Sequence, residues 1–380
     1  MNLSAYSVTV LLLIALLTAA CKPEEPVLQN DGLATLARHI EGYTQAKPGH
    51  PLVFPEDHGS HPDYRIEWWY LTANLQDPAG NAYGAQWTIF RLATLPPEAD
   101  NPDYILDNKQ IFMAHFAITT LSEHISFQRY SRAGGNRLDS RAGVIAHPFS
   151  VWLDDWVLES TDADWLPLEV RARQGDHALN LLLQSEASLV QQGDAGFSQK
   201  HPNGGGSYYY SHPFLQVSGE LEVDGQKVPV TGDAWLDREW SSQFLQSDQA
   251  GWDWFSIHLD SGEKLMFFQL RQQSEQHQDE NFLQGSLIAT NGSLTRLNPG
   301  DVQLEVLEEL VVADHLLPLH WRVSIPSFGR EFNIRALHPD QWMNVDFPYW
   351  EGAVIVSGKG PANRGRGYME LTGYPIQIDK

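Results

Sequence analysis

The chain has 380 residues, among them thirteen Trp, thirteen Tyr, sixteen Phe, thirty Gly and twenty-two Pro. The formal net charge of -23 argues against binding to nucleic acid and against electrostatic docking on anionic lipid. The length allows two domains or one large β domain. The abundance of aromatic residues, Gly and Pro favours strands and turns over helical bundles.

The first twenty residues contain no charged side chain and hold an apolar run from Val8 to Leu17, which is short for a membrane span. The sequence Leu-Thr-Ala-Ala-Cys, ending at Cys21, is similar to a bacterial lipobox. It predicts a lipoprotein signal peptide at 1–20 and a lipid anchor on Cys21. An ordinary secretory signal is the alternative. Because Lys22 follows the Cys, we expect the protein at the periplasmic face of the outer membrane.

Residues 21–60 are expected to form a tether and lead-in, in which 33–41 is the one short helix we expect. Cys21 is the only cysteine in the chain. After lipidation no thiol would remain for a disulfide or a thiolate metal site.

Two aromatic segments resemble one another, one from Trp68 to Arg91 and the other from Trp252 to Arg271. Each reads as a strand, a Gly-bearing turn and a second strand, and Trp68 aligns with Trp252. The similarity predicts two related β domains with the hairpins in equivalent places. A chance likeness between aromatic strands is the alternative.

Further short strands, separated by turn signals such as Asp224-Gly225 and Asn291-Gly292, are typical of antiparallel barrels or sandwiches. They are expected at 110–120, 149–159, 178–183, 215–223, 302–307, 321–325 and 353–358. The run Asn203-Gly-Gly-Gly-Ser207 breaks the pattern, so we place the domain boundary near 200–215. The domains then span 61–210 and 211–380.

Several familiar sites are missing from the sequence: it contains no P-loop, GxGxxG, GxSxG or HExxH motif. The closest pair of histidines, His58 and His61, lies in an expected loop. We predict no metal and no cofactor, and a zinc site assembled from distant histidines is the alternative.

Acids beside aromatic residues are the remaining candidates for chemistry. Side chains alternate along a strand, so Arg238 and Trp240 share one face. The other face carries three acids and a Trp: Asp233, Trp235, Asp237 and Glu239. Such a face is either wet or lines a polar cavity.

Glu67 shares a face with Trp69 in the sequence EWWYL. An isolated carboxyl in apolar surroundings would have a raised pKa and could donate a proton. The alternative is that Glu67 or Glu239 pairs with a buried arginine such as Arg91, Arg238 or Arg271.

The motifs EWWYLTANL, YGAQWTIFR, SYYYSHP, VTGDAWLDREW, GWDWFSIHLDSGEKLMFFQLR, YWEGAVIVSG and GRGYMELTGY occur in this order over residues 50–376. This region resembles the AttH-like, or carotenoid 1,2-hydratase-like, family of two-domain lipocalin-related bacterial proteins. The resemblance implies an all-β fold of two lipocalin-like antiparallel β-barrels packed together. It also implies a ligand cleft lined by these motifs.

The resemblance and the acid–aromatic pattern together nominate the site. The expected catalytic acids are Glu67, Asp237 and Glu239. The expected ligand-binding residues are Trp68, Trp69, Tyr70, His115, Tyr208, Trp235, Arg238, Trp240, Trp252, Trp254, Trp350, Glu351 and Tyr368. We expect at least two of the acids Glu67, Asp237, Glu239 and Glu351 to face one cavity.

The hydratase branch of the family carries His where this chain has Arg238, and an acid on the strand that here reads Met266 to Gln269. These differences favour a binding protein, anchored in the periplasm and holding an apolar ligand. The resemblance also implies ABC transporter components as candidate partners. The alternative is a hydratase, cyclase or isomerase that protonates an isoprenoid or other polyunsaturated substrate. A structural envelope lipoprotein is the third hypothesis.

Overall fold

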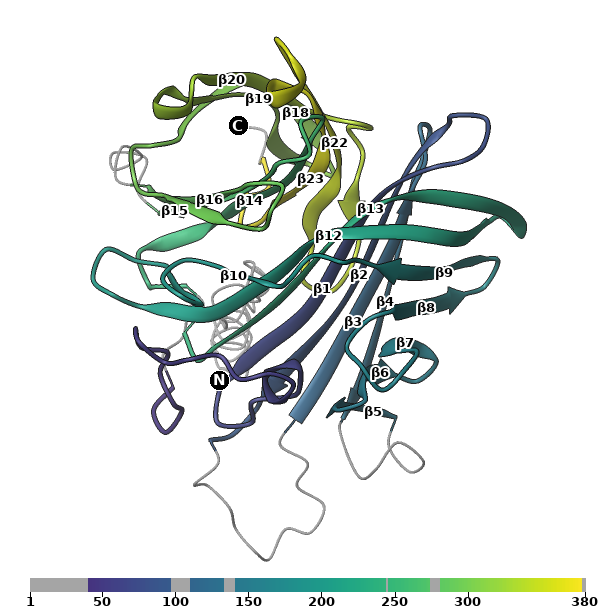
Figure 1. Ribbon diagram of the computed structural model, residues 1–380, viewed down its shortest axis with the longest axis vertical. Helices are drawn as coiled ribbons and strands as arrows, with labels where there is room; N and C mark the ends of the chain where they lie inside the picture. The colour runs from purple at the N-terminus through teal and green to yellow at the C-terminus, as the bar shows by residue number, and fades with distance from the viewer. Residues whose placement is uncertain (1–39, 97–109, 133–140, 244, 274–280, 378–380) are drawn as a thin grey trace, which may run out of the picture.

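The structure is a computed structural model that describes residues 40–96, 110–132, 141–243, 245–273 and 281–377. The expected signal peptide, Cys21 and nearly all of the expected helix at 33–41 lie outside these residues. Two antiparallel sheets dominate the described chain, and each curls into a barrel-like domain (Figure 1). The prediction of two packed lipocalin-like β-barrels is confirmed.

The first sheet has thirteen strands, and two short ones, β10 (Val190–Gln191) and β11 (Phe197–Gln199), pair with β12 at its side. Along the sheet the other strands run β4 (His124–Arg132), β3 (Gln110–Thr119), β2 (Ala82–Ala93), β1 (Ile66–Gln76), β13 (Gln226–Ser241), β12 (Gly206–Val223), β9 (His177–Gln184), β8 (Leu168–Gln174), β7 (Trp156–Ser160), β6 (Phe149–Leu153) and β5 (Ala142–Ala146).

The second sheet has ten strands, with β21 (Trp342–Met343) paired to β22 at its side. The others run β17 (Leu294–Leu297), β16 (Phe282–Ile288), β15 (Lys264–Gln272), β14 (Gln249–Leu259), β23 (Gly365–Leu371), β22 (Tyr349–Gly358), β20 (Arg330–Ala336), β19 (His315–Ile325) and β18 (Gln303–Val312). Short 3-10 turns occur at η1 (Glu56–His58), η4 (Pro326–Phe328) and η5 (Pro361–Asn363). Within the described chain, no helix is both long and apolar enough to span a membrane.

The two sheets share one connectivity. In each, the first strand of the aromatic hairpin, β1 or β14, pairs on its other side with the last strand of the sheet, β13 or β23. The hairpin registers also agree, because Trp68 pairs with Phe90 and Trp252 with Leu270. The expected equivalence of the two hairpins is therefore confirmed in strand order and in register.

The boundary between the two domains lies further along the chain than we predicted from the sequence. β12 starts at Gly206 and β13 ends at Ser241, and both belong to the first sheet. The first sheet is therefore complete only at Ser241, and the connection to the second sheet spans 242–248 instead of 200–215. The Gly-rich run was misleading because it leads into a strand of the same sheet.

One expected strand is in fact a hairpin. The segment 149–159 divides into β6 and β7, which pair with each other around a turn. Asp154 in that turn has φ 54°, a left-handed conformation that Asp tolerates better than most residues. Alternating apolar residues on both sides of the turn had concealed it.

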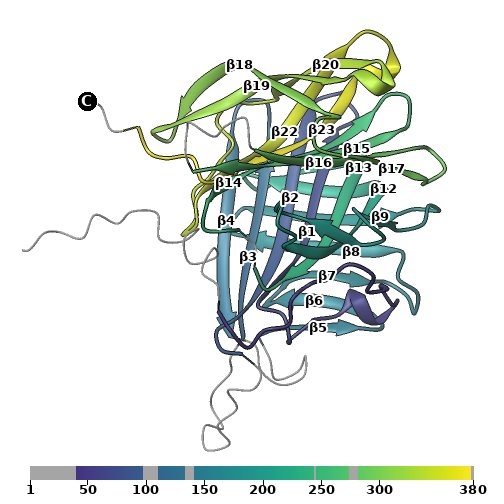
Figure 2. The same cartoon turned by 90° about the vertical axis from the view of Figure 1, so that its left-hand side faces the viewer.

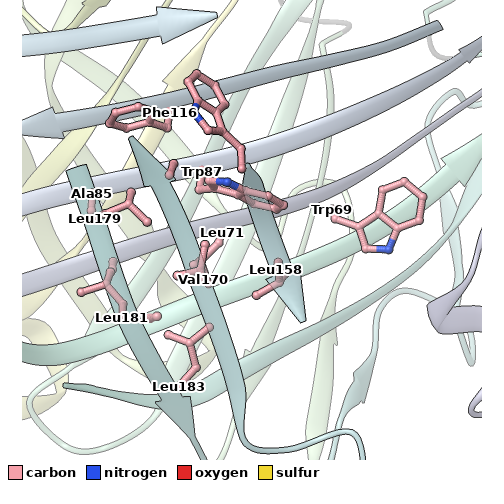
Figure 3. Packing of buried hydrophobic residues seen from close by; sticks show 14 of the residues in the cluster. Trp69, Leu71, Ala85, Trp87, Phe116, Leu158, Val170, Leu179, Leu181 and Leu183 are labelled. Carbon is pink, nitrogen blue, oxygen red and sulfur yellow. The ribbon is translucent and has the colours of Figure 1, made fainter. Parts of the chain in front are cut away.

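The first barrel is filled by large apolar side chains from opposite parts of its curled sheet. Trp69, Trp87 and Phe116 come from β1, β2 and β3, and they meet Leu158 and Leu181 from the far strands (Figure 3). Burying each such side chain contributes roughly 1.5–3 kcal/mol. A second apolar core, which includes Trp321 and Trp350, fills the other barrel.

β1 is buried on both of its faces. Trp69 and Leu71 point into the first barrel, whereas Trp68 and Tyr70 point toward the second sheet. Side-chain alternation thus explains the run of aromatics in EWWY, since one strand supplies two apolar layers. The second sheet lies against one face of the first (Figure 2). We call the side chains packed between the two sheets, among them Trp68, Tyr70 and Trp254, the inter-sheet layer.

Candidate active site in the inter-sheet layer

Strand register places one row of side chains from each sheet in the inter-sheet layer. On the first sheet the row runs Ser211, Asp237, Tyr70, Thr88 and His115. On the second sheet the equivalent row runs Glu351, Glu370, Trp254, Phe268 and Gln284. Asp237 and Glu370 therefore occupy equivalent positions in the two halves.

The two rows contact one another directly. The Tyr70 hydroxyl donates a short hydrogen bond to Glu351 Oε1, and the Trp254 indole Nε1 donates to the Tyr209 hydroxyl oxygen at 3.3 Å. The rings of Tyr70 and Trp254 meet edge to face, with centroids 5.3 Å apart. Polar side chains of one sheet are thus held by aromatic side chains of the other.

Asp237 is a buried carboxyl without a basic partner among the described residues. Its oxygens accept hydrogen bonds from Ser211 Oγ at 2.5 Å, Tyr209 Oη at 2.6 Å and Trp235 Nε1 at 2.6 Å. Burial raises the pKa of Asp237 to about 7, although these three neutral donors oppose the shift. Near neutral pH, Asp237 can therefore hold or release a proton.

Glu351 and Glu370 face each other on the paired strands β22 and β23. Burial raises the pKa of Glu370 to about 8, against a hydrogen bond from Trp252 Nε1 at 3.0 Å. Burial, followed by the neighbouring Glu370, raises the pKa of Glu351 well above its ordinary value. Two carboxyls this close cannot both ionise at low cost, so burial and mutual repulsion favour the neutral form of this pair.

Glu239 differs from these acids because it has a cationic partner. Its Oε1 lies 2.9 Å from Lys200 Nζ and accepts a short hydrogen bond from Ser207. Lys200 also lies over the rings of Tyr209 and Phe268, at 5.2 and 4.0 Å. Glu239 and Lys200 thus form an ion pair that stabilises the edge of the inter-sheet layer.

Four buried polar atoms that face the layer have no hydrogen-bond partner among the described residues. They are Gln86 Oε1, His115 Nε2, Ser256 Oγ and Glu351 Oε2. Buried polar atoms are normally paired, and leaving one unpaired costs about 1–3 kcal/mol. These four atoms are therefore candidate partners for a ligand or an ordered water.

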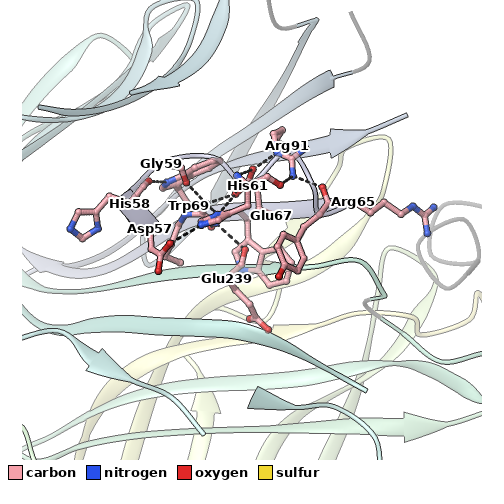
Figure 4. A network of polar contacts seen from close by, with 12 residues as sticks. Asp57, His58, Gly59, His61, Arg65, Glu67, Trp69, Arg91 and Glu239 are labelled. Atoms are coloured by element: carbon pink, nitrogen blue, oxygen red, sulfur yellow. Dashed lines mark hydrogen bonds and ion pairs between the residues drawn. The ribbon is translucent and has the colours of Figure 1, made fainter. Parts of the chain in front are cut away.

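Glu67 belongs to a different site, at one end of the first barrel (Figure 4). Its carboxylate is fully buried and forms short ion pairs with Arg91 and Arg238. The His61 backbone N–H donates to it at 2.9 Å. Burial alone would raise the pKa of Glu67, but the guanidinium groups of Arg91 and Arg238 hold it well below the ordinary value.

The paired alternative for Glu67 is therefore confirmed, and the expected isolated proton donor is wrong at this position. Arg271, the other arginine considered, pairs with Asp253 in the second barrel. Arg238 lies over the Trp69 ring at 3.9 Å, and His61 stacks on Trp240 with centroids 4.0 Å apart. The lead-in around His61 thereby closes this end of the barrel.

The residues nominated from the sequence divide among three places. The inter-sheet layer holds Trp68, Tyr70, His115, Trp235, Asp237, Glu239, Trp252, Trp254, Glu351 and Tyr368. The closed end of the first barrel holds Glu67, Trp69, Tyr208, Arg238 and Trp240. Trp350 lies in the core of the second barrel.

Sequence reasoning missed Glu370, Tyr349, Tyr209 and Lys200. Glu370 had a usable signal, because extending the repeat to the last strand of each half aligns it with Asp237. Tyr349, Tyr209 and Lys200 had no such sequence signal, since their roles depend on contacts between the sheets. Among the described residues, no group of three or more His, Cys, Asp or Glu is placed to hold a metal ion.

Two curled antiparallel sheets, with an aromatic and acid-bearing layer between them, define a two-domain lipocalin-like protein. The family model described as AttH-like matches residues 45–374. The chain belongs to the AttH-like family. No curated protein matches the sequence.

Solved structures with this fold include the following three. The crystal structure of an AttH from Nitrosomonas europaea is 36% identical with a TM-score of 0.74, over 87% of this chain and 100% of that chain. Kievitone hydratase from Nectria haematococca is 17% identical with a TM-score of 0.63, over 90% and 98%. CghA, determined with Sch210972, is 12% identical with a TM-score of 0.53, over 88% and 97%.

Proposed function

We propose that this protein is an acid–base enzyme of the hydratase or cyclase type, acting on an isoprenoid or another polyunsaturated substrate. The observation that carries the proposal is the set of buried carboxyls Asp237, Glu351 and Glu370, which lack a basic partner among the described residues and have raised pKa values. A neutral carboxyl can protonate an alkene, and aromatic faces such as Trp254 stabilise the resulting cation.

The sequence favoured a carrier of apolar ligands, but that function explains the buried carboxyls of the inter-sheet layer less well. Aromatic walls are sufficient for binding an apolar molecule. Buried carboxyl groups without a basic partner cost folding free energy, and groups with perturbed pKa values cluster at sites of chemistry. A fold shared with a protein named kievitone hydratase supports the enzyme hypothesis. The substitution of Arg238 for His does not oppose it, because Arg238 lies at the barrel end against Glu67.

Product analysis tests this proposal. Purified protein is incubated with kievitone or farnesol in ¹⁸O-labelled water, and mass spectrometry detects addition of labelled water or a cyclised isomer. Asp237→Asn and Glu351→Gln should each lower the rate by about 10²–10⁴-fold if the acid in question transfers the proton. The exposed Glu220→Gln is the control. Intact probe bound stoichiometrically without any product would instead support the carrier.

We also propose that a lipid on Cys21 anchors the protein at the periplasmic face of the outer membrane, with an ABC transporter as a candidate partner. Changing Cys21 to Ser should move the protein from the membrane fraction to the soluble fraction, because acyl chains supply the anchoring free energy. Fractionation followed by immunoblotting checks this. A Ser variant that stays in the membrane fraction to the same extent would refute the anchor.

A further inference from the structure

A chain of three side chains connects two of the unpartnered atoms in the inter-sheet layer. His115 Nδ1 lies 3.0 Å from the Tyr349 hydroxyl oxygen, and that hydroxyl lies beside the Glu351 carboxyl. His115 Nε2 is free at one end, and Glu351 Oε2 is free at the other. His115 and Glu351 are each 1% exposed, so bulk water does not supply either partner directly.

The hydrogen-bond directions follow from the chemistry of the groups. Burial, followed by Glu351, raises the pKa of Tyr349 well above its ordinary value, so Tyr349 keeps its proton and is the donor toward Glu351. Its oxygen then accepts the proton of His115 Nδ1. Burial lowers the pKa of His115 to about 3, so the ring is neutral and Nε2 carries a lone pair.

The two ends of the chain are thus chemically complementary. Both Tyr70 and Tyr349 present hydroxyls to the Glu351 carboxyl, and Tyr70 bonds to Oε1. The acid proton is therefore placed on Oε2, where it has no acceptor. Glu351 ends the chain as a proton donor, and His115 ends it as a proton acceptor.

From this geometry we infer that His115, Tyr349 and Glu351 form a relay that returns the proton after water is added to an alkene. The inference rests on the proposed function and makes it more specific. It assigns Glu351 as the acid, His115 as the base and Tyr349 as the connecting group.

The steps balance in atoms and electrons. The proton on Glu351 Oε2 bonds to one alkene carbon, which leaves a carbocation at the other carbon and a carboxylate at Glu351. The water oxygen bonds to the cation and gives one proton to His115 Nε2. His115 Nδ1 passes its proton to the Tyr349 oxygen, and Tyr349 passes its own proton to Glu351. The net reaction converts alkene and water to an alcohol and returns all three side chains to their starting charges. A switch of the His115 proton from Nε2 back to Nδ1, and of the Glu351 proton to Oε2, completes the cycle.

The relay predicts what kind of alkene is accepted. Protonation must yield a cation that survives until water attacks, so the substrate carries a trisubstituted or conjugated alkene. Phe90 packs against His115, and Trp254 packs against Tyr70, which bonds Glu351, so aromatic rings beside the relay are available to stabilise such a cation. The unpartnered Ser256 hydroxyl and Gln86 carbonyl give the substrate a donor and an acceptor for its own polar group.

Tyr349→Phe distinguishes a role of Tyr349 in proton transfer from a purely structural role, because it removes one hydroxyl and leaves Glu351 and His115 in place. With farnesol or kievitone in single-turnover experiments at excess protein, we expect the rate to stay within about three-fold of wild type. In multiple turnovers the steady-state rate should fall at least ten-fold, and added imidazole should restore part of it. Tyr374→Phe, which loses a hydroxyl bonded to Asp253 in the second barrel, is the matched control.

The outcomes distinguish this inference from the function on which it rests. If wild-type protein turns over a probe and Tyr349→Phe keeps the full steady-state rate, the relay is overturned and the enzyme hypothesis stands. If wild-type protein turns over neither probe, both fail. A readout independent of activity is the ¹⁵N spectrum of labelled histidine, assigned with His115→Gln. A proton on Nδ1 supports the relay, and a proton on Nε2 overturns it.

Discussion

Replacing Glu67 by Gln is expected to lower the free energy of unfolding by about 3–5 kcal/mol, the usual loss when one partner of a buried ion pair is removed. The side chain is 0% exposed, and Gln keeps its shape while leaving Arg91 and Arg238 without a counter-charge. Urea denaturation followed by Trp fluorescence would report the loss as a lower midpoint at unchanged slope.

The control for this variant is Glu220→Gln, which removes one partner of an exposed ion pair with Lys227. Such pairs contribute about 0–1 kcal/mol, so its midpoint should barely move. If Glu67→Gln is as mild as Glu220→Gln, Glu67 does not hold the end of the barrel together, and our account of that site is wrong.

The second large effect is a loss of stability as the pH rises from about 6.5 to about 8. Burial raises the pKa of Glu370 to about 8 and that of Glu351 well above its ordinary value, so the folded protein keeps protons that the unfolded chain releases above about 4.5. Below about pH 4.5, where the unfolded chain also binds these protons, the two acids contribute their full stabilisation. That stabilisation is lost as the pH rises toward the pKa that each acid has in the folded protein. Each group contributes up to about 1.4 kcal/mol per pH unit.

Buried histidines have the opposite effect at lower pH. Burial lowers the pKa of His58 and His115 to about 3 and of His124 and His212 to about 4. The unfolded chain binds protons at these positions below about 6.5, so stability rises with pH up to that value. We therefore expect a maximum near pH 6.5, with the acids alone setting the decline above it.

Thermal unfolding measured at several pH values between 5 and 9 tests this pH dependence. The double variant Glu351→Gln, Glu370→Gln should flatten the decline above pH 6.5 and steepen the rise below it, because the two acids oppose the histidines between about pH 4.5 and 6.5. A wild-type protein whose stability is constant or increases from pH 6.5 to 8 would show that these acids are already ionised in the fold.

Local alternation was the most reliable part of the sequence reasoning. It placed Asp237 and Glu239 on one face and Arg238 on the other, and it placed Glu67 beside Trp69, as the structure shows. It succeeded because the direction of a strand side chain depends only on its neighbours in sequence. The function of each face could not be predicted in the same way.

Contacts between distant strands could not be predicted from the alternation of side chains along one strand. Tyr70 bonds Glu351, which is 281 residues away, and His115 bonds Tyr349 at a separation of 234. Nothing local specifies which face of one sheet meets which face of the other. For the same reason Glu67 was grouped with Asp237, although the two acids point to opposite sides of β1 and β13 and serve different sites.

The proposed function requires neutral carboxyl groups in the inter-sheet layer at physiological pH. Infrared difference spectroscopy at pH 7, comparing wild-type protein with Glu351→Gln, tests it most directly, because protonated and ionised carboxyls absorb at well-separated frequencies. Our account predicts that the wild type shows a protonated-carboxyl band and that the variant loses it. A carboxylate band that disappears in the variant would show that Glu351 is ionised, and would contradict both the proposed proton donor and the relay.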